Sequence, residues 1–122
     1  MKKLCVLAVC AVAVVGFAHS SADAIPPFQK VFYAEYLDNS DNAEFVAAVK
    51  EVKCNLCHDP DSKSKKDRNP YGDALSKLLD KKEDKDNTEK VVASLKTVSE
   101  AKSPSGATFG ELIKSGKLPG AK

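Results

Sequence analysis

The chain has 122 residues, with 19 lysine and arginine residues against 17 aspartate and glutamate residues, and its formal net charge is +2 at neutral pH. A chain so close to neutral lacks the excess of positive charge that is typical of proteins that bind nucleic acids or anionic membrane surfaces, so we expect no nucleic-acid partner. A chain of this length makes one small domain, which buries a modest fraction of its surface.

The first two dozen residues have the pattern of a secretory signal peptide. Two lysines precede an apolar run over residues 4–18, and a stretch of small residues ends at Ala24. The apolar run is too short for a comfortable membrane span, and no second one follows it. We therefore expect a signal peptide over residues 1–24 and a periplasmic or secreted domain over residues 25–122, with no stable membrane insertion. An uncleaved N-terminal anchor is the alternative.

Cleavage after Ala24 changes the inventory of metal-binding side chains. It removes two lysines and one aspartate, which lowers the net charge to about +1, and it removes Cys5, Cys10 and His19. The two remaining cysteines and the one remaining histidine all lie within residues 54–58. Two cysteines exclude a framework of several disulfides, so a large bound cofactor is the natural source of additional core.

Two amphipathic helices are predicted before this cluster. Aromatic residues recur every four positions over residues 28–37, which indicates a short helix with one aromatic face. After a polar turn, Asp41 and Glu44 form a capping-box pattern for a second helix. The apolar stripe of that helix runs directly into the cluster and consists of Phe45, Val46, Val49, Val52 and Leu56.

A polar loop and a third helix follow the cluster. Residues 59–69 contain no large apolar side chain, which predicts a solvated loop. Asn69 and Pro70 then supply a cap and a favoured first-turn proline for a helix. The mixed-charge run over residues 81–87 indicates a linker or a frayed helix end, and we assign it no function.

Two more helices are predicted towards the C-terminus. Periodic apolar residues indicate a helix from residue 88 to about residue 102. Thr108 and Glu111 form a second capping-box pattern, for a short helix that Gly116 ends. No strand-like alternation occurs in the sequence, so the predicted fold class is all-α, with four or five short helices.

The cluster Cys54-Asn55-Leu56-Cys57-His58 has the C-x-x-C-H pattern of c-type haem attachment. Two thiols three residues apart on a helical turn can each add to a haem vinyl group, and the adjacent histidine is then placed to give a ring nitrogen to the iron. The pattern therefore predicts covalent haem binding by Cys54 and Cys57, with His58 as an axial iron ligand.

Two alternatives use the same residues. One is a Cys54–Cys57 disulfide or a thioredoxin-like redox pair, but thioredoxin-like chemistry needs a βαβ surround, and no strand is predicted. The other is structural zinc, which needs four ligands. Only three cysteine or histidine ligands remain after cleavage, and they lie too close together along the chain to complete a tetrahedron.

The chain resembles the small monohaem cytochromes c, in which a helix leads into C-x-x-C-H and further helices pack around the haem. The segment Arg-Asn-Pro-Tyr-Gly at residues 68–72 is also similar to one that follows the motif in other small secreted monohaem proteins. The resemblance implies a class I-like domain with haem c on Cys54 and Cys57 and iron bound by His58. It also implies electron transfer with redox partner proteins and no enzymatic turnover beyond a weak peroxidase-type activity at an open iron.

The sixth iron position departs from the family pattern, because Met1 and His19 both lie in the predicted signal peptide and no other methionine or second histidine exists. The alternatives are an open site, the α-amine of Ile25, a lysine, or Tyr71. Removing the proton from the donor atom at neutral pH costs about 1 kcal/mol for the amine, roughly 4 to 5 for a lysine and about 4 for tyrosine. An open site has no such cost, so it is the favoured alternative. The lysines placed where a methionine ligand is expected are Lys96, Lys102, Lys114 and Lys117.

Other side chains are given packing or propionate-pairing roles. We expect the hydroxyl of Tyr71 to reach a haem propionate or a backbone carbonyl rather than the iron, and Arg68 either to pair with a propionate or to stay solvated. The aromatic residues expected to pack in the core and around the haem are Phe28, Phe32, Tyr36, Phe45 and Phe109.

Two functions are open at this point. Loss of the methionine thioether lowers the potential of a haem iron, so the first is a low-potential electron carrier. The second is an open-site haem protein that binds NO, CO, O₂ or peroxide as a sensor, scavenger or weak peroxidase. Efficient peroxidase chemistry requires a distal acid–base group such as histidine, which argues against the last of these roles. A structural haem protein, or a subunit of a larger secreted complex, is a third possibility.

Overall fold

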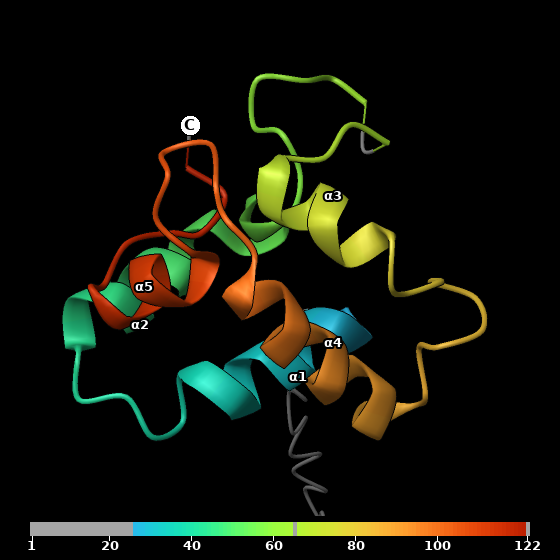
Figure 1. Ribbon diagram of the computed structural model, residues 1–122, viewed down its shortest axis with the longest axis horizontal. Coiled ribbons are helices and arrows are strands. Elements are labelled where there is room, and N and C mark those ends of the chain that lie inside the picture. The colour runs from blue at the N-terminus through green and yellow to red at the C-terminus, as the bar shows by residue number, and fades with distance from the viewer. Residues whose placement is uncertain (1–25, 65, 122) are drawn as a thin grey trace, which may run out of the picture.

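The computed structural model describes residues 26–64 and 66–121, and this part of the chain is built from helices (Figure 1). No strand forms within it, and extended pairing is limited there to two isolated bridges. The all-α fold class is therefore confirmed for the described residues. In chain order the elements are α1 (Pro27–Tyr36), α2 (Ala43–Val52), the 3₁₀ helix η1 (Lys53–Leu56), α3 (Pro70–Ser76), α4 (Thr88–Glu100) and α5 (Phe109–Lys114).

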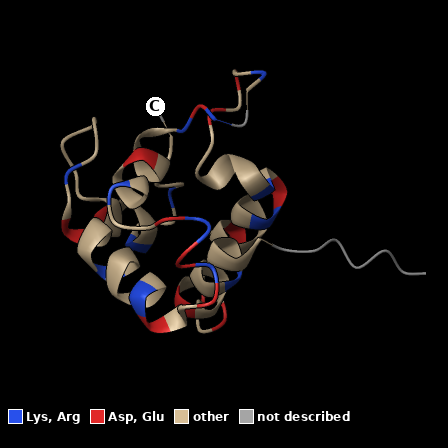
Figure 2. Ribbon diagram, turned by 90° about the vertical axis from the view of Figure 1, so that its right-hand side faces the viewer, with Lys and Arg blue, Asp and Glu red and all other residues tan. Residues whose placement is uncertain are grey.

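The predicted signal peptide and its cleavage point lie outside the described residues, as do Met1, His19 and Ile25. Within the described ranges, no helix is both long enough and apolar enough to cross a membrane. Lysine and arginine positions are interspersed with acidic ones along the described part of the ribbon, in keeping with the near-neutral charge (Figure 2).

Side-chain caps set where the helices begin. Thr108 and Glu111 form the predicted capping box of α5, with N···O distances of 3.1 and 2.7 Å. The box predicted for α2 at Asp41 is wrong, because the helix begins one residue later. Its cap is Asn42, whose Oδ1 accepts a hydrogen bond from the Phe45 amide at 3.0 Å.

The longest helix, α4, lies at the centre of the packing and contacts α1, α3 and α5 (Figure 1). The buried apolar side chains of α4 pack in a core to which Leu56 of η1 and Tyr71 of α3 also belong. Phe32, Phe45 and Phe109 are buried as predicted, and the other two predicted aromatic residues lie at the edge of this core. The residues of the core are Phe32, Leu37, Phe45, Val49, Leu56, Tyr71, Leu75, Leu79, Val91, Leu95, Val98, Phe109 and Ile113.

The charged segment between α3 and α4 is a linker held in place by its own side chains. The carboxylate of Asp84 is 7 % exposed and accepts hydrogen bonds from Lys90 Nζ at 2.9 and 2.8 Å and from the Asp80 amide at 2.8 Å. The Asp80 carboxylate in turn accepts bonds from the Lys82 and Glu83 amides. The segment therefore has a defined path between the two helices and is not a frayed helix end.

This linker predicts an acid-sensitive contribution to stability. The hydrogen bond from Lys90, followed by the Asp80 amide, holds the pKa of Asp84 below its ordinary value of 3.8. A carboxyl whose pKa is lower in the folded state stabilises the fold above its unfolded pKa, and that stability is lost as the pH falls through the folded value. In urea titrations, Asp84→Asn is expected to flatten the loss of stability below pH 3.8, whereas Asp86→Asn, an exposed neighbour, is not. Equal pH profiles for the wild-type chain and Asp84→Asn would contradict this.

Candidate haem-attachment site

The C-x-x-C-H segment lies on a separate turn, and not on a continuation of α2. The α-helix ends at Val52, and Lys53 has a φ of 50°, a conformation that residues other than glycine seldom adopt. The chain then winds as η1, where the amides of Cys57 and His58 both donate to the Cys54 carbonyl, at 3.3 and 3.1 Å. The predicted apolar stripe does reach the motif through buried Leu56, but the backbone changes direction before the first cysteine.

The two cysteines are free thiols with different environments. Cys54 is exposed, whereas Cys57 is partly buried. Burial, aided by Cys54 and opposed by the positive charge of Arg68, raises the pKa of the Cys57 thiol to about 12, so this side chain is a neutral thiol at physiological pH. The alternative of a Cys54–Cys57 disulfide is not present in this structure.

The imidazole of His58 is oriented by a backbone carbonyl. Its Nδ1 lies 3.3 Å from the carbonyl oxygen of Asp67. A carbonyl oxygen only accepts hydrogen bonds, so Nδ1 is the donor in this contact, and Nε2 is the ring nitrogen that the contact does not use. Histidines that bind metals typically donate their second ring N–H in this way, which fixes the tautomer and the ring orientation.

The polar loop after the motif folds back on it. His58 and Arg68 form an isolated antiparallel bridge, and the Asp59 amide donates to the same Asp67 carbonyl at 3.1 Å. The prediction of a polar loop is correct, since Arg68 and most of its neighbours are exposed. The composition gave no sign of the backbone contact that orients His58, because any residue at position 67 could supply a carbonyl.

Asn69 connects the motif to α3. Its side chain is buried, and Nδ2 donates to the carbonyls of Asn55 at 3.1 Å and Leu56 at 2.9 Å. Its Oδ1 accepts from the Gly72 amide at 2.9 Å, which is the predicted helix cap, and its own amide donates to the Cys57 carbonyl at 3.1 Å. Only the cap was visible in the sequence. The two side-chain bonds to the motif join residues thirteen and fourteen positions apart, beyond the reach of a local pattern.

The first turn of α3 packs directly on the motif backbone. A Cβ atom at Gly72 would lie 1.9 Å from the Cys57 carbonyl oxygen. Near the C-terminus, a Cβ atom at Gly120 would lie 2.0 Å from Asn69 Nδ2. Both positions therefore need glycine because of a close approach, and the C-terminal segment covers the outer side of Asn69.

Tyr71 is fully buried beside this contact. Its ring packs edge-on against Phe32 and Phe109, with centroid distances of 6.0 and 5.3 Å. Among the described residues, its hydroxyl has no hydrogen-bond partner, so the predicted bond to a backbone carbonyl is not formed. Burial is the main cause that raises the pKa of Tyr71 above its usual range, with smaller contributions from Cys57 and Tyr36, and the side chain is therefore a neutral phenol.

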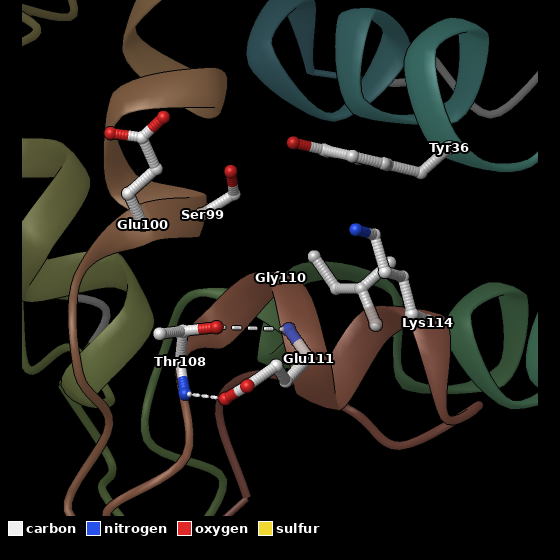
Figure 3. A pocket seen from close by; sticks show the side chains of 8 residues that line it. Tyr36, Ser99, Glu100, Thr108, Gly110, Glu111 and Lys114 are labelled. Carbon is white, nitrogen blue, oxygen red and sulfur yellow. Dashed lines mark hydrogen bonds between the residues drawn. The ribbon is translucent and has the colours of Figure 1, made fainter.

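The four lysines considered as iron ligands all lie on the surface, with exposed side chains. Lys96 pairs with Glu35 of α1 at 3.4 Å, and Lys114 lines a cavity of about 480 Å³ between α1, α4 and α5. Figure 3 shows Lys114, Tyr36 and Ser99 around this cavity, which no residue of the C-x-x-C-H motif lines.

Within residues 26–64 and 66–121, no three histidine, cysteine, aspartate or glutamate side chains gather closely enough to hold a metal ion between them. This finding includes the motif, so Cys54, Cys57 and His58 are not gathered as ligands of one ion in this structure. No family model, curated protein or solved structure matches the chain.

Proposed function

We propose that the protein is a secreted or periplasmic c-type haem protein, similar to the small monohaem cytochromes c, that carries single electrons between redox partner proteins. The observation that carries the proposal is the orientation of the His58 ring: Nδ1 lies 3.3 Å from the Asp67 carbonyl oxygen, so that Nε2 is the ring nitrogen left to bind an iron ion. The imidazole directly follows two free thiols at the spacing that covalent haem attachment requires. Cys54 and Cys57 would hold the haem through thioethers, and His58 would bind the iron.

Two further features support this assignment. The motif backbone is fixed through Asn69 and Gly72, which gives a covalently bound group a rigid base. The buried hydroxyl of Tyr71, on the helix that packs on the motif, has no hydrogen-bond partner among residues 26–64 and 66–121. When bound, haem supplies an iron centre that alternates between the ferric and ferrous states, and the chain's own residues hold and shield that centre.

The experiment that tests this proposal is covalent haem analysis. The full chain is expressed in a host with a c-type haem maturation system, denatured, and examined by intact mass and haem staining. We expect the wild-type chain to carry one haem, and Cys54→Ala and Cys57→Ala to lose most of it. Cys10→Ala is the matched control, because Cys10 lies in the predicted signal peptide and its loss should leave haem content unchanged. Undiminished covalent haem in both motif variants would overturn the assignment.

A ligand-binding function at the sixth iron position is the second candidate. It is favoured by the positions of the described alternatives: the four lysines are exposed, one of them in an ion pair, and Tyr71 is a buried neutral phenol. The Ile25 amine stays a candidate ligand outside the described residues.

Optical spectra with and without CO separate these two functions. If the sixth position is open, the dithionite-reduced protein will be high-spin and its spectrum will shift promptly when CO is added, and ligand binding then becomes the leading function. A six-coordinate, low-spin spectrum indifferent to CO would exclude the open site and leave the low-potential electron carrier with a protein ligand such as the Ile25 amine.

A further inference from the structure

The segment that follows α5, residues 116–120, packs against the rest of the fold along its length, and we call it the strap. It begins where the Gly116 amide donates to the Ile113 carbonyl at 3.0 Å and the Lys117 amide donates to the Leu112 carbonyl at 2.8 Å. Gly116 has a φ of 77°, a conformation that favours glycine. These bonds end α5 and fix the direction in which the strap leaves it.

The strap touches the caps of the two helices that flank the C-x-x-C-H motif. At its first residue, a Cβ atom on Gly116 would overlap the side-chain nitrogen of Asn42, the cap of α2. At its last residue, a Cβ atom on Gly120 would lie 2.5 Å from Cγ of Asn69, the cap of α3. Between these contacts, Pro119 is fully buried. One short segment therefore braces the chain both before and after the motif.

Asn69 connects the strap to the thiol pair. Its side chain bonds to two motif carbonyls, and its amide donates to the Cys57 carbonyl at 3.1 Å. The first turn of α3 abuts the same Cys57 carbonyl at Gly72. The Cys57 side chain is partly buried against the core, whereas Cys54 is exposed. A displacement of Asn69 would therefore loosen the packing that covers Cys57 and leave Cys54 as it is.

We propose that the strap is a conformational device that controls access to the Cys57 thiol. While the strap is in place, the thiol is protected; when the strap is released, the motif opens locally and the helical core stays folded. Local openings of this kind start in short segments with few buried contacts, and the strap is such a segment outside the helices. The inference goes beyond the proposed function and does not depend on it, because the contacts that carry it belong to the haem-free chain.

Gly120→Ala tests the strap with the smallest change. The φ of Gly120 is not positive, so alanine can adopt its backbone conformation, and the cost of the substitution lies in the contact with Asn69. The Asn69 side chain makes three hydrogen bonds and cannot rotate away without breaking them. Pro119→Ala is the second variant, because it removes buried contacts of the strap without adding an atom. Ala121→Ser, at an exposed residue beside the strap, is the matched control.

The measurement is labelling of the haem-free full chain with N-ethylmaleimide, with each labelled cysteine identified by tandem mass spectrometry. In this reaction the thiol sulfur bonds to one carbon of a carbon–carbon double bond and the proton goes to the other, so no oxidant is needed. We expect Cys54 to be labelled much faster than Cys57 in the wild-type chain. Both strap variants should raise the rate at Cys57 about tenfold or more, relative to Cys54 in the same chain, whereas Ala121→Ser should not.

Val91→Ala separates release of the strap from unfolding of the whole domain. Val91 is a buried residue of α4 outside the strap, and its truncation lowers the stability of the core. Urea titrations give the unfolding free energy of every variant. At equal unfolding free energy, the strap variants should label at Cys57 faster than Val91→Ala does, because their openings are local.

Three results would overturn the inference: equal labelling rates at Cys54 and Cys57 in the wild-type chain, an unchanged Cys57 rate in both strap variants, or no difference from Val91→Ala at equal stability. None of them bears on whether the thiols carry haem. Covalent haem analysis decides that question separately, so failure of this inference and failure of the proposed function are distinguishable.

Discussion

Gly72→Ala is expected to destabilise the fold by about 3 kcal/mol or more, although alanine is normally the better residue inside a helix, by about 1 kcal/mol. The added Cβ would lie 1.9 Å from the Cys57 carbonyl oxygen and 2.8 Å from the carbonyl carbon. Both atoms belong to the backbone, so no side-chain rotation relieves the clash. Either α3 must move away from η1 or the motif must shift.

Urea denaturation of the two chains measures this effect, with Gly106→Ala as the control. A Cβ at Gly106 meets nothing within 4 Å, and the only cost is that of placing alanine at a φ of 90°, on the order of 1 to 2 kcal/mol. A loss for Gly72→Ala no greater than that for Gly106→Ala would show that α3 does not approach the motif as closely as described.

Asn69→Ala is expected to cost about 3 kcal/mol and to loosen the motif. The substitution leaves two motif carbonyls and the Gly72 amide without the partners they have at 2.9 to 3.1 Å. Each buried group left unpaired costs about 1 to 3 kcal/mol, reduced where water can enter. Asn42→Ala is the matched control, because Asn42 caps α2 through a single bond to the Phe45 amide, and loss of a cap alone costs about 1 kcal/mol.

Denaturant titration of both variants tests this difference. Equal losses for Asn69→Ala and Asn42→Ala would mean that Asn69 is only a helix cap. Under the proposed function, Asn69→Ala should also lower the fraction of chains that carry covalent haem, whereas Asn42→Ala should not.

The elements that follow from local chemistry could be predicted from the sequence. The helix predicted from residue 88 to about residue 102 forms as α4, Thr88–Glu100, because its apolar period and its end signals agree. The capping box at Thr108 is also local, and so is the start of α3 at Asn69 and Pro70. In each of these cases the partner groups lie within a few residues of one another.

What could not be predicted depends on contacts between distant residues or on competition between neighbours. Asp41 and Asn42 can both cap a helix, and only the structure selects Asn42. The positive φ of Lys53 leaves no mark in the apolar stripe, which runs on to Leu56 as if α2 continued. The thiol pair and His58 could be predicted as a candidate site from their spacing, and this stays a prediction. The contact of His58 with the Asp67 carbonyl, and the burial of a Tyr71 hydroxyl that has no partner among the described residues, needed the tertiary structure.

The bridge between His58 and Arg68 closes the polar loop at its base. Doubling the length of a flexible loop whose ends are already pinned costs only about 0.6 kcal/mol. The tip of this loop is therefore a suitable place to graft a label or a docking epitope, since an insertion there leaves the His58–Asp67 contact in place. Under the proposed function, the loop tip can therefore vary in sequence and length while the backbone contact that orients His58 stays in place.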